Sequence, residues 1–358
     1  MTNINIDLIK QIDPQNVYGS VIDLPGQCLH AWEEANKVDI PQDYTNIENV
    51  VMCGMGGSGL GARVIESLYF PNLKVPLTRI NGYHIPAFVN EKTLVITSSY
   101  SGNTEETIQN FKEALDKKAK IISIGAGGEL IELSKTNNTP YYLINPTHNP
   151  SNQPRMAIGY SVIGQLVLAA KAGILNINQS EVEEAVKTMS EVVESNDINK
   201  NENPQTLSIA NTLKDKIVLY FSSEHLIGAV HVVNNQLNEN AKNLSFDFPI
   251  PETNHHLMEG LKNPNTNGSN IHAVFFTSDL YSPQIKKRFE ITQEVISKNK
   301  ISNIQYNPKA ESKFSQVFET IQYWAFVNYY LSILYEQDPA PIQWVDYFKK
   351  RMEELKNG

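Results

Sequence analysis

The stretch Leu94-Val-Ile-Thr-Ser-Ser-Tyr-Ser-Gly-Asn-Thr-Glu-Glu-Thr107 joins a strand pattern to a helix pattern through a polar turn. Residues 94–97 are apolar and β-branched, which is typical of a buried strand. A helical spacing of apolar residues begins near Thr104 and continues to about Leu115. The turn between the two patterns carries hydroxyl groups at Ser98, Ser99, Ser101 and Thr104.

A hydroxyl-rich turn between a strand and a helix is a candidate anion site. The first backbone N–H groups of a helix have no partner within it and lie at the positive end of its dipole. No Lys or Arg occurs in the turn, so a phosphate there would be held mostly by hydrogen bonds. The alternative is an ordinary helix start, in which Asn103 and Glu106 form a capping box.

Composition limits the classes of protein to which the chain can belong. Its 358 residues suit two domains, and 41% hydrophobic residues are ample for real cores. A net charge of −9 without an extended basic patch argues against a nucleic-acid or anionic-membrane partner. Two cysteines, Cys28 and Cys53, argue against a disulfide framework or a cysteine-based metal cluster. With neither a signal peptide nor a membrane-length apolar run expected, we predict a cytoplasmic protein.

Strand and helix patterns alternate through the first half of the chain, which predicts a parallel sheet covered on both faces. The helical lead-in includes a helix at about 24–38. The predicted strands are 47–53, 76–80, 93–97, 120–124 and 140–144. The predicted helices between and after them are 62–69, 105–117, 129–135 and 156–172.

The same alternation begins again after an Asn-, Glu- and Ser-rich stretch that holds one helical segment, 180–194. We therefore predict an N-terminal domain at 1–172, a connector at 173–206 and a C-terminal domain at 207–358. In the second half, strands are predicted at 216–221, 243–248, 271–277 and 301–306. Helices are predicted at 226–241, 283–298 and 312–335, with a last helix in the tail. The similar order of elements indicates a duplicated fold.

A glycine-rich loop from Gly54 to Gly59 follows the first predicted strand and matches G-x-G-x-x-G, the dinucleotide fingerprint. The next strand lacks the acidic residue that binds a ribose, although Arg79 could serve a 2′-phosphate. An NADP-dependent oxidoreductase therefore remains one alternative. A second is a loop that lets the backbone approach a smaller sugar phosphate, with Ser58 directed at it. A third is a tight turn required only for packing.

Several segments together resemble the sugar isomerase (SIS) domain. Gly54-Met-Gly-Gly-Ser-Gly59 is followed some 40 residues later by Ser99-Tyr-Ser-Gly-Asn-Thr-Glu-Glu106. More narrowly, the chain resembles the bifunctional phosphoglucose/phosphomannose isomerase family. That resemblance extends over most of the chain through Gln153-Pro-Arg155, Gln236-Leu-Asn-Glu-Asn-Ala-Lys242, Pro251-Glu-Thr-Asn-His255, Asp338-Pro-Ala-Pro-Ile342 and Phe348-Lys349.

The resemblance implies two SIS-type α/β domains, each a parallel sheet flanked by helices in a flavodoxin-like three-layer arrangement. It also implies an aldose–ketose isomerase that interconverts glucose 6-phosphate and mannose 6-phosphate with fructose 6-phosphate through a cis-enediolate. Such an enzyme needs no cofactor and no metal. It would be a homodimer, with the active site near the interface.

The resemblance further implies roles for individual residues. Glu239 would move the proton between C1 and C2, and Arg155 would stabilise the enediolate. His255 would open the sugar ring with Lys349 beside it, and His255 is the residue expected to come from the partner subunit. The phosphate would be bound by Gly57, Ser58, Ser99, Ser101 and Thr104.

The chain departs from the family pattern at three places. The family's Asn-His-Asn-Glu is Asn254-His-His-Leu257 here, so His256 replaces an amide. Ala340 replaces a threonine, which bears on the mannose 6-phosphate activity. Lys350 stands next to Lys349, which leaves the choice of lysine open.

The chemistry of the reaction agrees with this assignment. One carboxylate can take and return the proton if it is held over the enediolate, provided that partial burial raises its pKa. A fixed Arg stabilises the developing charge, and the phosphate provides binding energy that positions the sugar. One further class stays open beside the oxidoreductase, a non-catalytic sugar-phosphate-binding SIS protein. An isomerase of the glucosamine-phosphate synthase type is a nearer relative, but we do not expect it, because it would need a Cys-led glutaminase domain that the sequence does not indicate.

Overall fold

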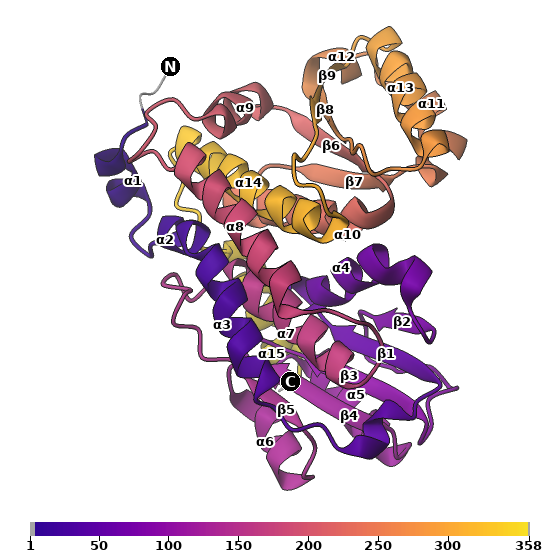
Figure 1. Cartoon of the computed structure of the whole chain (residues 1–358). Helices are drawn as coiled ribbons and strands as arrows, with labels where there is room; N and C mark the ends of the chain where they lie inside the picture. Colours follow the sequence, from indigo (N-terminus) through magenta and orange to yellow (C-terminus); the bar gives the residue numbers. More distant parts are fainter. Residues whose placement is uncertain (1–3, 357–358) are drawn as a thin grey trace.

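The computed structural model describes residues 4–356 and contains two parallel sheets flanked by helices, which confirms the predicted fold class (Figure 1). The first sheet, called sheet A here, has the strand order β2-β1-β3-β4-β5. Its strands are β1 (Asn49–Gly54), β2 (Leu77–Ile80), β3 (Thr93–Ser98), β4 (Lys120–Gly125) and β5 (Tyr141–Leu143). All five lie where the sequence predicts strands.

The second sheet, called sheet B, has the order β7-β6-β8-β9. Its strands are β6 (Ile217–Ser222), β7 (Ser245–Pro249), β8 (Ile271–Phe276) and β9 (Ser302–Tyr306). β6 therefore holds the position of β1, β7 that of β2, β8 that of β3 and β9 that of β4. This correspondence confirms that the fold is duplicated.

Helices precede, connect and follow the strands. In the first half they are α1 (Ile6–Ile12), α2 (Val17–Ile22), α3 (Leu24–Asn36), α4 (Leu60–Tyr69), α5 (Glu105–Asp116), α6 (Gly128–Thr136) and α7 (Ile158–Lys171). In the remainder they are α8 (Gln179–Asn196), α9 (Gln205–Leu213), α10 (Ile227–Gln236), α11 (Leu257–Gly260), α12 (Asn267–Asn270), α13 (Pro283–Lys298), α14 (Lys313–Leu334) and α15 (Gln343–Lys356). The sequence patterns did not predict α9.

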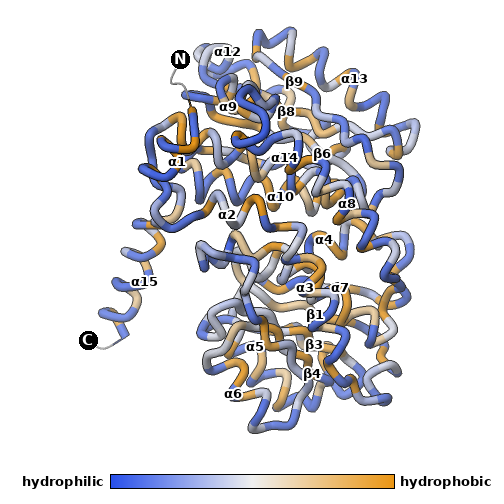
Figure 2. The backbone as a smooth tube through the Cα atoms, turned by 60° about the vertical axis from the view of Figure 1, so that its left-hand side comes forward, coloured by the Kyte–Doolittle hydropathy of each residue, from blue (hydrophilic) through white to orange (hydrophobic). Residues whose placement is uncertain are grey.

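The last helix, α15, differs from the other long helices because none of its described residues is buried. Figure 2 shows it standing apart from the two sheets. Trp344 and Phe348 are 75% and 62% exposed, and Leu355 is 70% exposed. The placement of α15 therefore depends mainly on its attachment to the rest of the chain.

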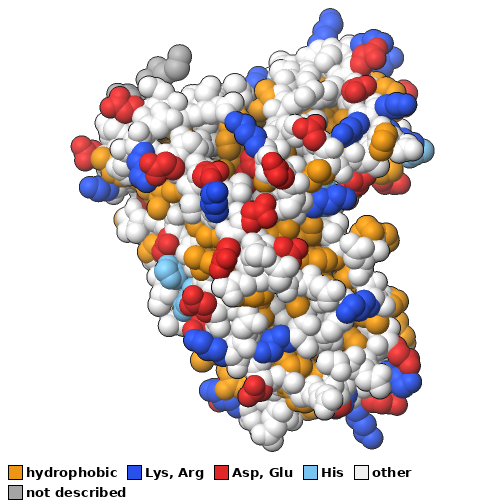
Figure 3. Space-filling model, in the orientation of Figure 1, with side chains coloured by type: hydrophobic (Ala, Val, Ile, Leu, Met, Phe, Trp, Pro, Cys, Tyr) orange, Lys and Arg blue, Asp and Glu red, His pale blue; other side chains and the backbone are white. Residues whose placement is uncertain are grey.

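The surface carries mixed charge. On the face drawn in Figure 3, acidic and basic side chains are interspersed. A notch on the right separates the upper half, which holds sheet B, from the lower half, which holds sheet A. No helix among residues 4–356 has both the length and the apolar character needed to cross a bilayer.

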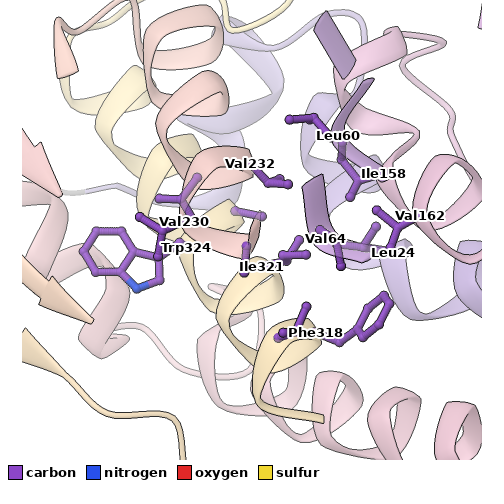
Figure 4. Close-up of a cluster of buried hydrophobic side chains, with 14 of the residues drawn as sticks. Leu24, Leu60, Val64, Ile158, Val162, Val230, Val232, Phe318, Ile321 and Trp324 are labelled. Carbon is purple, nitrogen blue, oxygen red and sulfur yellow. The ribbon is translucent and has the colours of Figure 1, made fainter. Parts of the chain in front are cut away.

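The two halves share one continuous apolar core (Figure 4). Val64 of α4 and Val162 of α7 lie on the side of sheet A, and Val230 of α10 lies on the side of sheet B. Trp324 and Phe318 of α14 belong to the same cluster. Buried methyl and aromatic groups thus fix the two sheets relative to each other.

The stretch 173–206, predicted as a connector, consists largely of α8. This helix packs against α3 and α14 and buries Val182, Ala185 and Met189. Its start is fixed by a capping box between Asn178 and Glu181. A second, smaller core lies on the other face of sheet A, where α5 and α6 cover it.

Candidate active site

The turn after β3 is held in shape by its own hydroxyl groups. Ser99 is fully buried, and its Oγ lies 2.8 Å from Thr104 Oγ1. The same Oγ accepts a hydrogen bond of 3.1 Å from the N–H of Gly102. Ser101 is exposed, and its Oγ accepts from the N–H of Asn103 at 3.2 Å. The turn therefore holds the paired hydroxyl groups of Ser99 and Thr104 on its inside and the exposed hydroxyl group of Ser101 on its outside.

The start of α5 has no side-chain cap. Thr104 is the N-cap residue in extended backbone, and no side-chain oxygen among the described residues accepts from the first turn. The capping box considered from the sequence is therefore wrong. The Oδ1 of Asn103 instead accepts from the N–H of Glu129, at the start of α6, at 3.0 Å. The open N–H groups and the helix dipole at Thr104 suit a bound anion.

The glycine loop after β1 is tied to this turn. The residues Gly56–Gly59 form one turn of 3-10 helix, and Gly56 has a positive φ of 48°. Ser58 Oγ accepts a hydrogen bond of 2.9 Å from the N–H of Tyr100. Gln165 of α7 donates to the Ser58 carbonyl at 2.9 Å. Ser58 and Ser99 therefore belong to one rigid wall.

Gly57 lets the backbone approach a second wall. A Cβ on Gly57 would lie 3.3 Å from the Cα of Arg155 and 3.3 Å from the carbonyl of Pro154. The absence of a side chain thus brings the glycine loop against the segment that carries Arg155. On the neighbouring strand, Arg79 pairs with Glu66 through an N···O distance of 2.6 Å. Arg79 is therefore engaged with α4, which argues against a 2′-phosphate site there.

Arg155 is 3% exposed and lies at the centre of the candidate site. Its Nε donates to Asn240 Oδ1 at 2.5 Å, and one terminal nitrogen donates to the carbonyls of Pro339 and Ala340 at 2.7 Å each. The other terminal nitrogen donates to Gln153 at 3.0 Å. Burial lowers the pKa of Arg155, while neighbouring carboxylates oppose that shift. The guanidinium is thus a fixed cation with little freedom to reorient.

Glu239 lies next to this cation. It is part of a single π-helical turn, Leu237–Ala241, that follows α10, and such turns are frequent at functional sites. Its carboxylate lies 3.9 Å from Arg155 Nε and is 31% exposed. Burial raises the pKa of Glu239, and the charges of Arg155, Lys242 and Lys349 oppose this shift. The carboxylate is therefore partly desolvated and directed at a fixed positive charge, as a proton-transferring base requires.

One face of α15 is turned toward this group. Asp346, Lys349 and Lys356 share that face at helical spacing. Asp346 acts on the pKa of Arg155, Lys349 acts on that of Glu239, and Lys356 pairs with Glu105 at the start of α5. Lys349 therefore lies on the side of α15 that faces the site, and Lys350 lies about 100° further around the helix.

His255 is the predicted residue that the chain does not bring to this group. It is exposed, in a short turn (Glu252–His255) beyond the end of β7. Asn238, the neighbour of Glu239, bonds Ser245 at the start of β7, with its Nδ2 2.8 Å from Ser245 Oγ. Glu239 and His255 are therefore near opposite ends of a strand that spans about 13 Å. His256 is also exposed.

The sequence did not predict the site roles of four residues. Asn240 and Lys242 bond the groups around Arg155, and Asn103 and Gln165 brace the two loops. Asn240 and Lys242 lie within the Gln236–Lys242 segment, so the local sequence did contain a signal. Asn103 and Gln165 have partners in other elements, which no local pattern indicates.

Comparisons with known proteins show the family and the fold of the chain. Residues 202–352 match a family model described as the bacterial phospho-glucose isomerase C-terminal SIS domain. A bifunctional phosphoglucose/phosphomannose isomerase from Caldicellulosiruptor bescii is 32% identical over 356 residues, covering 95% of this chain and 100% of the relative. One from Aquifex aeolicus is 28% identical, covering 89% and 93%. A solved structure of a hypothetical protein from Thermus thermophilus has a TM-score of 0.75 at 17% identity, covering 98% of this chain and 93% of that chain, which shows a shared fold.

Proposed function

Since the chain belongs to the bifunctional phosphoglucose/phosphomannose isomerase family, we propose that it interconverts fructose 6-phosphate with glucose 6-phosphate and mannose 6-phosphate. The observation that carries the proposal is the arrangement around Gly57. A hydroxyl-rich turn at an uncapped helix start stands on one side, and the Glu239–Arg155 pair stands on the other. An anion-binding wall and a base beside a fixed cation are the two parts that this reaction requires.

The phosphate is bound at the start of α5 in this proposal. Ser58, Ser99, Ser101 and Thr104 donate hydrogen bonds, and the N–H groups of Gly57 and the first turn of α5 add to them. Ser99 and Thr104 bond each other in the free protein, so their hydroxyl protons turn toward the phosphate on binding. The binding energy orients the sugar chain toward Glu239.

Proton transfer takes place at Glu239. The carboxylate removes the proton from C2 of the open-chain aldose, and the enediolate forms with its negative charge beside Arg155. A proton passes from O2 to O1 of the enediolate, and the same carboxylate, now protonated, returns its proton to C1 as the C2 carbonyl forms. The raised pKa of Glu239 makes it a stronger base than an exposed glutamate and places the acidic limb of kcat above the ordinary pKa of that side chain.

Ring opening and closing use an imidazole and an ammonium group. We assign the imidazole to His255 of the partner subunit, because the His255 of the same chain lies beyond the far end of β7. The ammonium belongs to Lys349, which acts electrostatically on Glu239. The site is then complete only in a homodimer.

Exposed apolar surface supports the homodimer. Trp344, Phe348 and Leu355 form an exposed stripe on α15, beside the face that carries Lys349. A second exposed pair, Leu244 at 52% and Phe246 at 45%, lies at the edge strand β7, which leads to His255. Clustered apolar side chains of this size on a surface mark interfaces. Light scattering that gives the mass of one chain at assay concentrations would contradict this assembly.

Proton NMR with fructose 6-phosphate in D2O tests the activity. We expect glucose 6-phosphate labelled with deuterium at C2, and mannose 6-phosphate as a second product. Binding of fructose 6-phosphate in a thermal-shift assay without turnover would instead indicate a sugar-phosphate-binding protein. Saturable binding of NADPH in a fluorescence titration, with no sugar conversion, would return the glycine loop to the oxidoreductase interpretation.

A further inference from the structure

Lys242 occupies an unusual position beside the candidate site. It follows the π-helical turn with a left-handed backbone, φ 50° and ψ 34°, which is uncommon for a residue with a side chain. Its Nζ donates to three backbone carbonyls, those of Asn240, Asp338 and Pro339, at 3.1, 3.0 and 2.9 Å. No salt bridge within 4.0 Å is formed by this ammonium among the described residues. All three hydrogen bonds of this ammonium go to backbone carbonyls, so we infer that Lys242 fixes the shape of the backbone around it.

The same segment is held from a second side by Arg155. One guanidinium nitrogen donates to the carbonyls of Pro339 and Ala340 at 2.7 Å each. Two cations therefore gather the three successive carbonyls of Asp338, Pro339 and Ala340. The turn is closed from within by Asp338 Oδ1, which accepts from the N–H of Ala340 at 2.9 Å. This turn is far more strongly bonded than a simple linker between two helices requires.

The Asp338–Ala340 turn connects the buried helix α14 to α15. Because no described residue of α15 is buried, its direction depends on how this turn is held and on the Lys356–Glu105 pair at its other end. We propose that Lys242 is a positioning residue for the isomerisation, which fixes the turn together with Arg155 and thereby holds Lys349 of α15 toward Glu239. This inference rests on the proposed function.

The ammonium of Lys242 also contributes its charge. Partial burial and the neighbouring Arg155 guanidinium lower the pKa of Lys242 to about 8, against the opposing charges of Asp338 and Glu239. Above that pH the neutral amine has two N–H donors for three carbonyls and no longer attracts Asp338. The turn then loosens, and Glu239 loses one of the positive charges that stabilise its ionised form.

The other charged groups around the turn have a different effect. Arg155 stays protonated in this pH range, because a guanidinium keeps its proton well above pH 10. Glu239 and Asp338 are carboxylates, and Asp346 of α15 is one as well. Lys349 is the other amine on this side of α15. It is present in every variant, so a difference between the Lys242 variants and the wild type does not come from its loss.

The experiment compares Lys242→Met and Lys242→Arg with a matched control, Lys214→Met. Lys214 also donates to a backbone carbonyl, that of Leu334 at 2.8 Å, which belongs to the last residue of α14 and lies outside the Asp338–Ala340 turn. We expect Lys242→Met to lower kcat by about 10- to 100-fold, the loss typical of a misplaced catalytic group. It also removes the alkaline limb near pH 8. Lys242→Arg keeps most of kcat and moves the limb to higher pH, and Lys214→Met changes neither.

Hydrogen exchange followed by mass spectrometry tests whether Lys242 holds the Asp338–Ala340 turn, independently of enzyme activity. Amides of residues 338–356 are expected to exchange several-fold faster in Lys242→Met than in the wild type, and unchanged in Lys214→Met. Unchanged exchange, or a wild-type pH profile in Lys242→Met, would overturn the positioning role. A wild-type protein that converts no hexose phosphate would contradict the proposed function alone, since the exchange comparison still decides whether Lys242 holds the turn. Circular dichroism verifies that each variant is folded.

Discussion

The four strands of sheet B follow the order of the first four strands of sheet A, but the carboxyl ends of the two sheets differ in what they hold. At sheet A, the turns after β1 and β3 present hydroxyl groups and the uncapped start of α5. At sheet B, the corresponding turns after β6 and β8 are filled. Tyr281 is buried there and accepts from the N–H of Ser223 at 3.1 Å, and His225 lies 2.9 Å from Gln316 Oε1.

The two sheets also differ at a helix start, because the start of α13 beside sheet B is already bonded to a carboxylate of the chain itself. Glu224 accepts from the N–H of Ser282, the N-cap residue of α13, at 3.1 Å. A negative group at a helix start is favourable whether it belongs to a ligand or to the chain. Sheet B therefore carries its own anion at the place where sheet A is open to one. The two copies thus share a topology, and within residues 4–356 sheet A is the one whose helix start is open to an anion.

The C-terminal half contributes its site residues from the amino end of sheet B. Glu239 and Asn240 lie in the π-helical turn after α10, close to the start of β7. Arg155 connects this turn to the first half, through Asn240 and the Pro339–Ala340 carbonyls. The site thus lies between the carboxyl end of one sheet and the amino end of the other.

The largest expected effect comes from Glu239→Gln. It removes the proton carrier while keeping the shape of the side chain, so kcat should fall by about 10²- to 10⁴-fold with little change in KM. The matched control is Glu224→Gln, which alters the carboxylate at the filled end of sheet B and should leave kcat intact. Steady-state kinetics with fructose 6-phosphate measures both. Comparable losses of kcat in Glu239→Gln and Glu224→Gln would contradict the assignment of proton transfer to Glu239.

A second prediction concerns His225, at the carboxyl end of sheet B, and the dependence of the free energy of unfolding on pH. Burial lowers the pKa of His225 to about 4, and its bond to Gln316 opposes that shift. The unfolded chain, with a histidine pKa of about 6.5, therefore binds the proton more readily. The stability that neutral His225 provides is fully present above that pH and is lost as pH falls toward 4, by about 3 kcal/mol.

His225→Gln should flatten this part of the stability curve, which urea unfolding at pH 7 and pH 4.5 measures. His256→Gln, at an exposed position, is the control and should keep the wild-type slope. A His225→Gln protein whose stability declines with acid as steeply as the wild type would refute the assignment of this loss to His225.

Ser99→Ala and Thr104→Ala test the proposed phosphate site at the carboxyl end of sheet A. Each removes one charge-assisted hydrogen bond to the phosphate, so KM should rise by an amount equivalent to about 1.5–3 kcal/mol with kcat little changed. Ser278→Ala changes a hydroxyl in the turn after β8 of sheet B, which donates to Gln316 at 2.7 Å, and should lower stability without affecting KM.

The two hydroxyls of the open end bond each other, so the double variant should lose less than the sum of the single losses. Inorganic phosphate as a competitive inhibitor gives an independent measure of the same site. An unchanged KM in both single variants would place the phosphate elsewhere.

The sequence was sufficient for the strands and most helices, because buried parallel strands are short apolar runs that need no partner to be recognised. It also indicated the Ser99 turn and the segment around Glu239. The sequence could not indicate the hydrogen-bond partners of Arg155, since Pro339 is 184 residues away along the chain. The capping box at Asn103 was a sound local inference, but a tertiary bond to Glu129 replaced it. Local patterns predict elements, and the contacts between distant elements form the site.

The smallest expected effect concerns Ala340, which stands where the family resemblance implies a threonine. Ala340 is 1% exposed and its side chain belongs to the apolar core, while its carbonyl is 2.7 Å from an Arg155 nitrogen, so a change at this position lies next to a group that holds the fixed cation. We expect Ala340→Thr to raise the ratio of mannose 6-phosphate to glucose 6-phosphate formed initially from fructose 6-phosphate. One neutral hydrogen bond corresponds to about a 2- to 10-fold change in that ratio.

Ala340→Val has the shape of threonine without the hydroxyl and is therefore the matched control. If the ratio changes in the threonine variant alone, a hydrogen bond discriminates the C2 epimers. If both variants change it equally, the added volume acts by moving the Asp338–Ala340 turn, and with it Arg155. Product ratios from early NMR time points separate these cases, because the ratio at equilibrium is the same for every variant. A ratio that neither substitution alters would mean that the half of the site built around Arg155 does not distinguish the two epimers.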